Sequence, residues 1–261
     1  MNHPKSNPCP EQDAEPAVAA VICAAGSSAR MRGVKKEYRL LPGKTGGSAG
    51  NLTVLGAAVS AFAAVPEITT IVIAVPTDPE NGEAAAQKAL PPEFLAEGKS
   101  PSILFVRGGA TRRASVFNAL SLLADYAPGF VLIHDGARPW VSPSLIQRII
   151  AGVKKYRAVI PLLPLTETPK ETDTPLDSAA TDAVFIKRHI KRAFMGAAQT
   201  PQAFAFPEIL AAHEQAAERE ESQHIEFTDD AEVWASFCGP VAAIPGESEN
   251  RKITFPEDLV C

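Results

Sequence analysis

The loop at residues 24–36 combines small side chains with two widely spaced cations, Arg30 and Lys36. It begins AAGSS after an apolar run, so its backbone N–H groups could approach a polyphosphate closely. The cations could then neutralise phosphate charge, Lys36 as a compact ammonium group and Arg30 as a fork across two oxygens. Because charge repulsion is the main obstacle to attack of a phosphate on a nucleoside triphosphate, the pattern favours nucleotidyl transfer. A tight strand-to-helix connection, with Lys36 in solvent beside Lys35, is the plainer alternative.

Two common phosphate-binding motifs do not fit the sequence. Gly43-Lys44-Thr45 resembles the end of a P-loop, but that motif needs a glycine at position 38, where this chain has Tyr38. The dinucleotide fingerprint G-x-G-x-x-G also fails after the first apolar run, where only Gly26 is present of the three glycines needed. A nicotinamide cofactor is therefore disfavoured.

The elements that must position this loop follow from the hydrophobic pattern. Short apolar, β-branched runs alternate with segments of helical spacing, which predicts βαβ units, a mainly parallel sheet and an α/β fold. The expected strands lie at 17–23, 70–75, 103–106, 130–133 and 158–163, with shorter ones near 241–244 and 252–254. Helices are expected from Thr111, from Ser142 as an N-cap, at 206–220, and at 229–237 with Thr228 or Asp229 as the cap.

Three regions depart from this alternation. The first sixteen residues contain four prolines and few apolar residues, which is typical of a disordered tail. Residues 43–51 hold four glycines and predict a flexible surface loop. From about 164 to 191 the chain is polar, threonine-rich and interrupted by proline before a short β-like run. We interpret this last region as an arm that leaves a single domain at 17–261 and pairs with a second subunit, giving a homodimer.

Composition restricts the class of protein. With 261 residues, 46% of them hydrophobic, the chain can form a substantial core. A net charge of -5 gives no general attraction to a nucleic acid polymer. Four cysteines without a C-x-x-C pair suggest neither a zinc site nor a disulfide framework. Acidic residues ahead of the first apolar run argue against an export signal, and no run reaches the roughly 18 apolar residues that span a bilayer. We therefore expect a cytoplasmic protein without a membrane partner.

Four later segments converge with the first loop: VRGGATRRASV, IHDGARPW, AAQTPQAF and ENRKITFPEDL. Together they resemble the cytidylyltransferases that make 4-diphosphocytidyl-methylerythritol in the non-mevalonate isoprenoid pathway. The resemblance runs from about residue 17 to 260, in the family's order. The motif of the first loop occurs across nucleotidylyltransferases in general, whereas the GGxxRxxS and DxARP motifs are typical of the enzymes that transfer cytidylyl groups. The resemblance implies a Rossmann-like three-layer sandwich with a protruding β-arm.

The resemblance also implies a CTP site. Ala24, Ala25 and Gly26 would lie along the ribose and phosphates, with Arg30 and Lys36 as catalytic cations on the triphosphate. Four residues would read the cytosine: Gly108, Gly109, Arg112 and Ser115. Glycines let backbone groups meet a base edge, and a hydroxyl can bond a carbonyl or amino group. The alternative for Ser115 is a position inside a helix, with its hydroxyl on its own backbone.

On the acceptor side the resemblance implies a second set of residues. Asp135 and Arg138 would lie where nucleotide and acceptor meet, and Asp135 could also help hold a magnesium ion or another divalent cation. The acceptor phosphate would be bound by four residues: Thr168, Arg192, Thr200 and the catalytic Lys252. The alternative to a ligand-binding role is that Asp135 pairs with Arg138 and only stabilises a turn. Arg188 competes with Arg192, because Lys191 stands where the family usually has an aspartate.

The activity implied by the resemblance is transfer of CMP from CTP to 2-C-methyl-D-erythritol 4-phosphate. Ser28 replaces a glycine of the family's loop and restricts positive φ there, which puts the loop geometry in question. The rival hypotheses are the same chemistry on another alditol phosphate, such as ribitol 5-phosphate, and a non-catalytic nucleotide-binding homologue.

Overall fold

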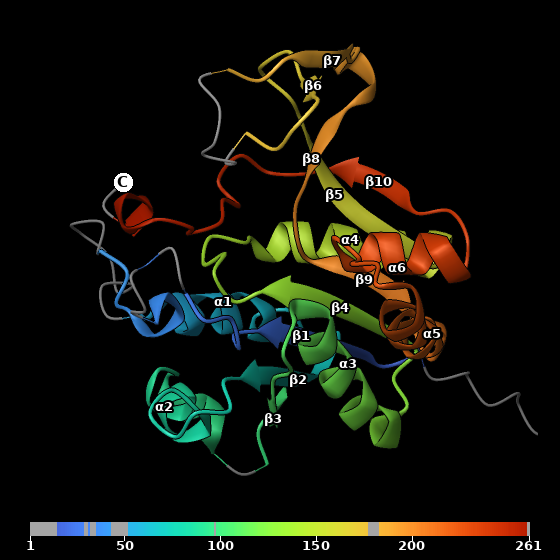
Figure 1. Ribbon diagram of the computed structural model, residues 1–261. Helices are drawn as coiled ribbons and strands as arrows, with labels where there is room; N and C mark the ends of the chain where they lie inside the picture. The colour runs from blue at the N-terminus through green and yellow to red at the C-terminus, as the bar shows by residue number, and fades with distance from the viewer. Residues whose placement is uncertain are drawn as a thin grey trace, which may run out of the picture.

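The computed structural model describes residues 15–28, 31, 35–42, 52–96, 98–176 and 183–259. Arg30, the predicted loop at 43–51 and nearly all of the predicted tail lie outside these ranges. The centre of the molecule is an 8-stranded sheet with the order β10-β5-β9-β4-β1-β2-β3, and β8 pairs with β5 (Figure 1). Its strands are β1 (Val18–Cys23), β2 (Ile68–Val75), β3 (Ser102–Arg107), β4 (Phe130–Asp135), β5 (Ala158–Pro164), β8 (Gly196–Ala198), β9 (Gln202–Ala205) and β10 (Ala242–Pro245).

The sheet is mainly parallel, as the sequence predicted. β1 pairs in parallel with both β2 and β4, β2 with β3, and β5 with β10. The exception is β9, which runs antiparallel between β4 and β5. The pattern did not indicate β9 because it is only four residues long and buried throughout, so it shows no alternation. The prediction of a strand near 252–254 is wrong, because that segment pairs with no strand of the sheet. The N–H of Ile253 instead donates to the carbonyl of Ala137, in a loop, at 2.8 Å.

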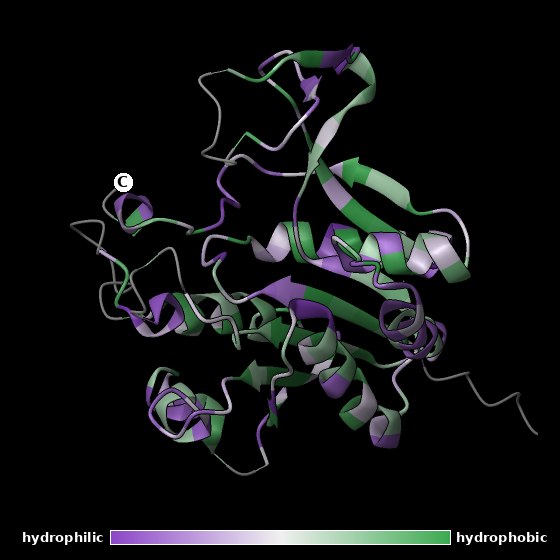
Figure 2. Cartoon of the chain, viewed as in Figure 1, coloured by the Kyte–Doolittle hydropathy of each residue, from purple (hydrophilic) through white to green (hydrophobic). Residues whose placement is uncertain are grey.

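Helices cover both faces of the sheet, which gives the three layers. Alternate residues of β1 separate into two cores, with Ile22 in one and Val21 in the other. The first core includes residues of α1 (Val54–Ala63), α2 (Glu83–Lys88) and α4 (Pro143–Tyr156). The second includes residues of α3 (Arg112–Leu123), α5 (Glu208–Gln223) and α6 (Asp230–Phe237). Figure 2 shows the strands between these layers as mostly hydrophobic, consistent with a sheet buried on both sides.

The helix starts follow the predicted caps. The side chain of Thr111 accepts from Ala114 N–H, and that of Ser142 accepts from Leu145 N–H. For α6 the cap is Asp229, one of the two predicted alternatives. Short 3-10 helices lie at η2 (Lys36–Tyr38), η3 (Pro92–Leu95), η4 (Ala124–Tyr126), η5 (Arg192–Phe194) and η6 (Pro256–Leu259).

The predicted arm contains a separate antiparallel pair, β6 (Lys170–Thr172) with β7 (Ile186–His189). It rises above the sheet at the top of Figure 1, beyond the ends of β5 and β8. Large apolar side chains in and beside the arm are exposed in this chain, among them Phe185 at 75% and Phe194 at 84%. In the part of the chain that the structure describes, no helix is both long and apolar enough to span a bilayer.

Candidate active site

A cavity of about 470 Å³ lies at the carboxyl ends of β1 and β4, the edge where open α/β sheets place ligands. Residues from five separate segments line it. Those among the predicted site residues are Ala25, Gly26, Lys36, Gly109, Arg112, Ser115, Asp135 and Lys252. Gly108 lines an adjoining cavity of about 200 Å³, and Ala24 is buried beneath the loop. The structure thus brings together most of the residues predicted for the nucleotide.

A buried charge pair holds the loop that follows β1. Lys35 Nζ donates to the carbonyl of Gly26 at 2.6 Å and lies 3.4 Å from Glu37 Oε2, with both side chains under 10% exposed. Burial lowers the pKa of Lys35, and the facing carboxylate of Glu37 partly offsets that. The sequence showed Lys35 only as a neighbour of Lys36. The adjacent Lys36 instead lines the cavity, which is the arrangement that the phosphate-binding hypothesis requires.

Ser28 adopts the left-handed backbone conformation that the family's glycine would take easily. Its φ is 51°, which costs a non-glycine residue about 1 kcal/mol or more. Its hydroxyl donates to Glu37 Oε2 at 3.3 Å and accepts from the N–H of Lys36 at 3.5 Å. The serine thus keeps the turn and adds side-chain contacts that a glycine could not make.

The paired glycines before α3 allow two loops to pack closely. A Cβ atom on Gly108 would lie 2.3 Å from Cβ of Ala25, and one on Gly109 would lie 2.5 Å from Cβ of Ala114. Ser115 Oγ accepts from Gly109 N–H at 3.0 Å and donates to the carbonyl of Thr111 at 2.9 Å. Its donor is therefore used within the turn, which is the alternative that the sequence left open for this serine. Its predicted contact with cytosine stays a prediction, and this geometry argues against it.

Gly108→Ala should destabilise the protein and weaken binding of CTP, the nucleotide expected from the sequence. The new methyl group must push the first loop away, and overpacking of this kind costs about 1–3 kcal/mol. We expect a lower Tm by calorimetry and a KM for CTP raised about 10-fold, since the two displaced loops line both cavities. Gly26→Ala is the steric control, because a Cβ there meets nothing within 4 Å, so its Tm should equal that of the wild type. An unchanged Tm for Gly108→Ala would contradict the close packing.

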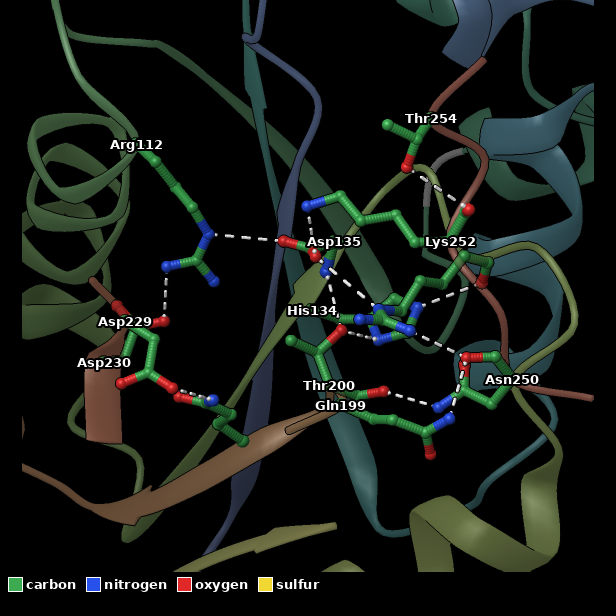
Figure 3. A network of polar contacts seen from close by, with 12 residues as sticks. Arg112, His134, Asp135, Gln199, Thr200, Asp229, Asp230, Asn250, Lys252 and Thr254 are labelled. Carbon is green, nitrogen blue, oxygen red and sulfur yellow. Dashed lines mark hydrogen bonds and ion pairs between the residues drawn. The ribbon is translucent and has the colours of Figure 1, made fainter. Parts of the chain in front are cut away.

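Asp135 is surrounded by three cations, two of which, Arg112 and Lys252, are labelled in Figure 3. Its Oδ1 lies 3.2 Å from Arg112 Nε, and its Oδ2 lies 2.9 Å from Lys252 Nζ and 3.6 Å from Arg138 Nε. Burial alone would raise the pKa of Asp135, but these cations together hold it well below its usual range. The carboxylate is therefore permanently ionised near neutral pH, which suits positioning and not proton transfer.

Thr200 supports this carboxylate from behind. Its hydroxyl accepts from the backbone N–H of Asp135 at 3.1 Å and lies 3.0 Å from His134 Nδ1. His134 Nε2 faces the carbonyl of Arg138 at 3.2 Å, so we assign the ring proton to Nε2. Nδ1 is then an acceptor, and the Thr200 hydroxyl donates to it. The hydroxyl of Thr200 is buried and its donor is used, which argues against its predicted direct role on the acceptor phosphate.

The buried imidazole of His134 should make stability fall in acid. Burial lowers its pKa to about 4, against about 6.5 in an unfolded chain. Below pH ~6.5 the unfolded state therefore binds a proton at this histidine, whereas the folded state binds it only below pH ~4. The stability from this group is fully present above pH ~6.5 and is lost as the pH falls from there towards 4. Between pH 8 and pH 5 the loss from this group is about 2 kcal/mol. Urea unfolding at both pH values should show that difference shrinking in His134→Gln but not in the exposed control His224→Asn.

Amide side chains tie the C-terminal segment to the sheet. Gln199 Nε2 donates to the carbonyls of Glu247 and Asn250, and Asn250 Nδ2 donates to the carbonyl of Thr200 at 2.8 Å. These bonds fix the segment that brings Lys252 to Asp135. The sequence marked AAQTPQAF and ENRKITF as motifs but gave no role to their amides, because which carbonyls they reach depends on contacts between distant segments.

The residues predicted for the acceptor phosphate do not all gather at the cavity. Thr168 and Arg192 are exposed and do not line it, and Arg192 Nη1 donates to the carbonyl of Thr166 at the base of the arm. The competing Arg188 pairs with Glu171 at 2.7 Å within the arm. Arg138 is turned into the protein, where Nη1 donates to the carbonyl of Asn250 at 2.8 Å. The roles of these residues stay predictions.

The described side chains do not form a metal site by themselves. No group of three His, Cys, Asp or Glu in the described ranges is placed to hold a metal ion. Both oxygens of Asp135 already face cations, so a metal ion would have to share this carboxylate with Arg112 or Lys252. The predicted metal role of Asp135 stays a prediction, and the described donor set argues against a metal site made by protein side chains alone.

Comparisons with known proteins agree with this architecture. Residues 18–261 match the model of the family IspD, 2-C-methyl-D-erythritol 4-phosphate cytidylyltransferase. A bifunctional enzyme IspD/IspF from Bradyrhizobium sp. (strain ORS 278) is 39% identical over 245 residues, which are 93% of this chain and 54% of that protein. The chain thus spans about half the length of the curated relatives it matches.

Solved structures agree as well. The 4-diphosphocytidyl-2C-methyl-D-erythritol synthase from Anaerococcus prevotii is 28% identical with a TM-score of 0.73, covering 94% of this chain and 93% of that one. The 2-C-methyl-D-erythritol 4-phosphate cytidylyltransferase from Thermus thermophilus is also 28% identical, with a TM-score of 0.61 over 94% and 96%. The resemblance inferred from the five motifs is confirmed, and the chain belongs to the 2-C-methyl-D-erythritol 4-phosphate cytidylyltransferase family.

Proposed function

We propose that the protein transfers CMP from CTP to 2-C-methyl-D-erythritol 4-phosphate, releasing pyrophosphate and forming 4-diphosphocytidyl-2-C-methyl-D-erythritol. The observation that carries the proposal is the cavity at the carboxyl edge of the sheet, where Lys36, Arg112 and Lys252 converge from three distant segments. Membership of the family and the names of its relatives support the nucleotide and the acceptor. The second activity in the names of the bifunctional relatives is not part of this proposal.

The chemistry needs charge and position more than a base. A phosphate oxygen of the acceptor attacks the α-phosphorus of CTP, and the bond to the β-phosphate oxygen breaks as pyrophosphate leaves. The attacking oxygen is already ionised, so no proton must be removed. Lys36 would face the phosphates from the first loop, and Lys252, oriented by Asp135, would stabilise the charge that brings the two anions together.

We further propose that magnesium enters with CTP, held mainly by phosphate oxygens and water. Such coordination is usual for magnesium in phosphoryl-transfer sites, and it requires no preformed cluster of protein ligands. The bound ion would supply additional positive charge to the phosphates. Chelation with EDTA should abolish transfer while leaving the Tm of the ligand-free protein unchanged. A large loss of Tm would instead indicate a metal bound within the fold.

We also propose a cytoplasmic homodimer formed through the arm. Leu176, Phe185 and Phe194 are at least 75% exposed in this chain, and burying each aromatic would contribute about 2 kcal/mol. Sedimentation at micromolar concentration should give the mass of a dimer. Phe185→Ser combined with Phe194→Ser should raise the dissociation constant at least 10-fold, whereas Tyr156→Ser on α4 should not. A monomer for the wild type at that concentration would contradict the proposal.

Pyrophosphate release with a panel of acceptors and nucleotides tests the activity. We expect release only with CTP and 2-C-methyl-D-erythritol 4-phosphate. Turnover with ribitol 5-phosphate instead would favour the alternative acceptor. Tight CTP binding without release from any acceptor would favour the non-catalytic homologue.

A further inference from the structure

Arg112 bridges two carboxylates on different sides of its guanidinium group. Its Nε lies 3.2 Å from Asp135 Oδ1 in the cavity, and its Nη1 donates to Asp230 Oδ2 at 2.8 Å (Figure 3). Asp230 is the first residue of α6, and its side chain is 1% exposed. It does not line the cavity, and the proposed function gives it no role.

A second buried side chain lies behind Asp230. His213, from α5, is fully buried, and its Nε2 lies 3.3 Å from Asp230 Oδ1. The 3.3 Å contact does not meet hydrogen-bond geometry, and neither ring nitrogen has another hydrogen-bond partner among the described residues, so the imidazole lies against this carboxylate as its polar neighbour. A line of contacts therefore runs from α5 through Asp230 and Arg112 to Asp135 at the cavity.

The charges of this line explain why Arg112 needs a second anchor. Asp135 alone faces the three cations Arg112, Arg138 and Lys252. Burial would raise the pKa of Asp230, but Arg112 and then His213 hold it below its usual range, so it supplies a second negative charge. Without that charge Arg112 would compete with Lys252 for the single carboxylate of Asp135.

We propose that Asp230 is a positioning residue that holds the Arg112 guanidinium in place for the nucleotide, with the imidazole of His213 packed against Asp230 from behind. The inference rests on the proposed nucleotide site. Nε and Nη1 are engaged, whereas no hydrogen bond to a described residue involves Nη2, which would donate to CTP. Fixing the fork beforehand avoids loss of its rotamer freedom on binding. The effect therefore falls on CTP affinity more than on the rate of transfer.

Double-mutant kinetics and calorimetric CTP binding test this inference. Asp230→Asn should raise the KM and Kd for CTP about 10-fold with kcat within about 3-fold, and Arg112→Gln should do the same or more. The double variant should be no worse than Arg112→Gln alone, because Asp230 acts through Arg112. Effects that multiply in the double variant would overturn the inference.

Two further variants separate positioning from general damage to α6. Asp229→Asn removes the neighbouring charge but keeps a good N-cap, and Asp229 bonds Gln202 and Glu232 instead of Arg112, so CTP affinity should stay within 2-fold. His213→Gln keeps a polar group beside Asp230 and should also stay within 2-fold, whereas His213→Leu places an apolar group there and should weaken CTP binding at least 3-fold. If Asp230→Asn does not fold, the comparison of the two His213 variants tests the inference instead. Equal CTP affinities for His213→Gln and His213→Leu would overturn it. Wild-type protein that binds CTP but transfers CMP to no acceptor would contradict the proposed function, while the Kd comparison would still test the positioning role.

Discussion

Replacing Lys36 by alanine should lower kcat for CMP transfer about 100- to 1,000-fold, the usual effect of removing one group that stabilises developing charge. Lys36 lines the cavity from η2, and the buried Lys35–Glu37 pair on either side of it fixes the backbone from which it extends. Since the wall of the cavity would otherwise stay intact, Tm should change by no more than a surface substitution does. Single-turnover measurements with saturating CTP would isolate the transfer step.

The control for this result is Lys88→Ala. Lys88 is exposed in the last turn of α2 and does not line the cavity, so its removal takes away one positive charge without touching the site. Its kcat should equal that of the wild type. Wild-type turnover by Lys36→Ala would remove this lysine from the mechanism.

Asp135→Asn should destabilise the fold by about 3 kcal/mol and reduce kcat about 100-fold. The substitution leaves Arg112, Arg138 and Lys252 facing one another without the carboxylate that separates them. The stability loss should lie at the lower end for broken buried pairs, because Lys252 keeps 40% of its side-chain exposure. The activity loss follows from misplacement of Lys252 and Arg112.

Urea unfolding and steady-state kinetics would measure both effects. Asp125→Asn, in the exposed η4 turn, serves as the charge-matched control and should change neither. Because the pKa of Asp135 is so low, the wild-type contribution should persist throughout the range above pH 5. A neutral effect of Asp135→Asn on stability would show that the three cations do not depend on this carboxylate.

The sequence predicted the parts of the site that are local in the chain. Small residues at 24–28, the glycines before α3 and the acid at the end of β4 each follow an apolar strand, so their gathering at one edge follows from a parallel sheet. The hydroxyls were harder to interpret, because Ser115 and Thr200 are equally suited to a ligand and to a backbone partner. The structure shows both engaged with protein groups.

Charged residues buried by distant segments could not be predicted. Even for Lys35, whose partners Gly26 and Glu37 are close in the chain, the sequence showed no sign of pairing, because the contacts form only when the loop folds back on itself. Asp230 and His213 belong to helices whose periodicity gives no sign that Arg112, more than 100 positions earlier, lies between them and the cavity. Polar pairing across such separations depends on the packing of α3 against α5 and α6.

The antiparallel pairing of β8 with β5 has a consequence for how this molecule can vary. Pro164 lies opposite Gly196, so residues 165–195 leave and re-enter the sheet at one point, and the pairing closes that excursion at its base. The residues that line the cavity lie outside the excursion, which carries only the predicted acceptor residues Thr168 and Arg192. Doubling the length of a closed loop costs only about 0.6 kcal/mol. A change in the length of the arm should therefore cost the fold little, and exchanging it for one of different length should alter the proposed self-association while leaving the sheet and its helices folded.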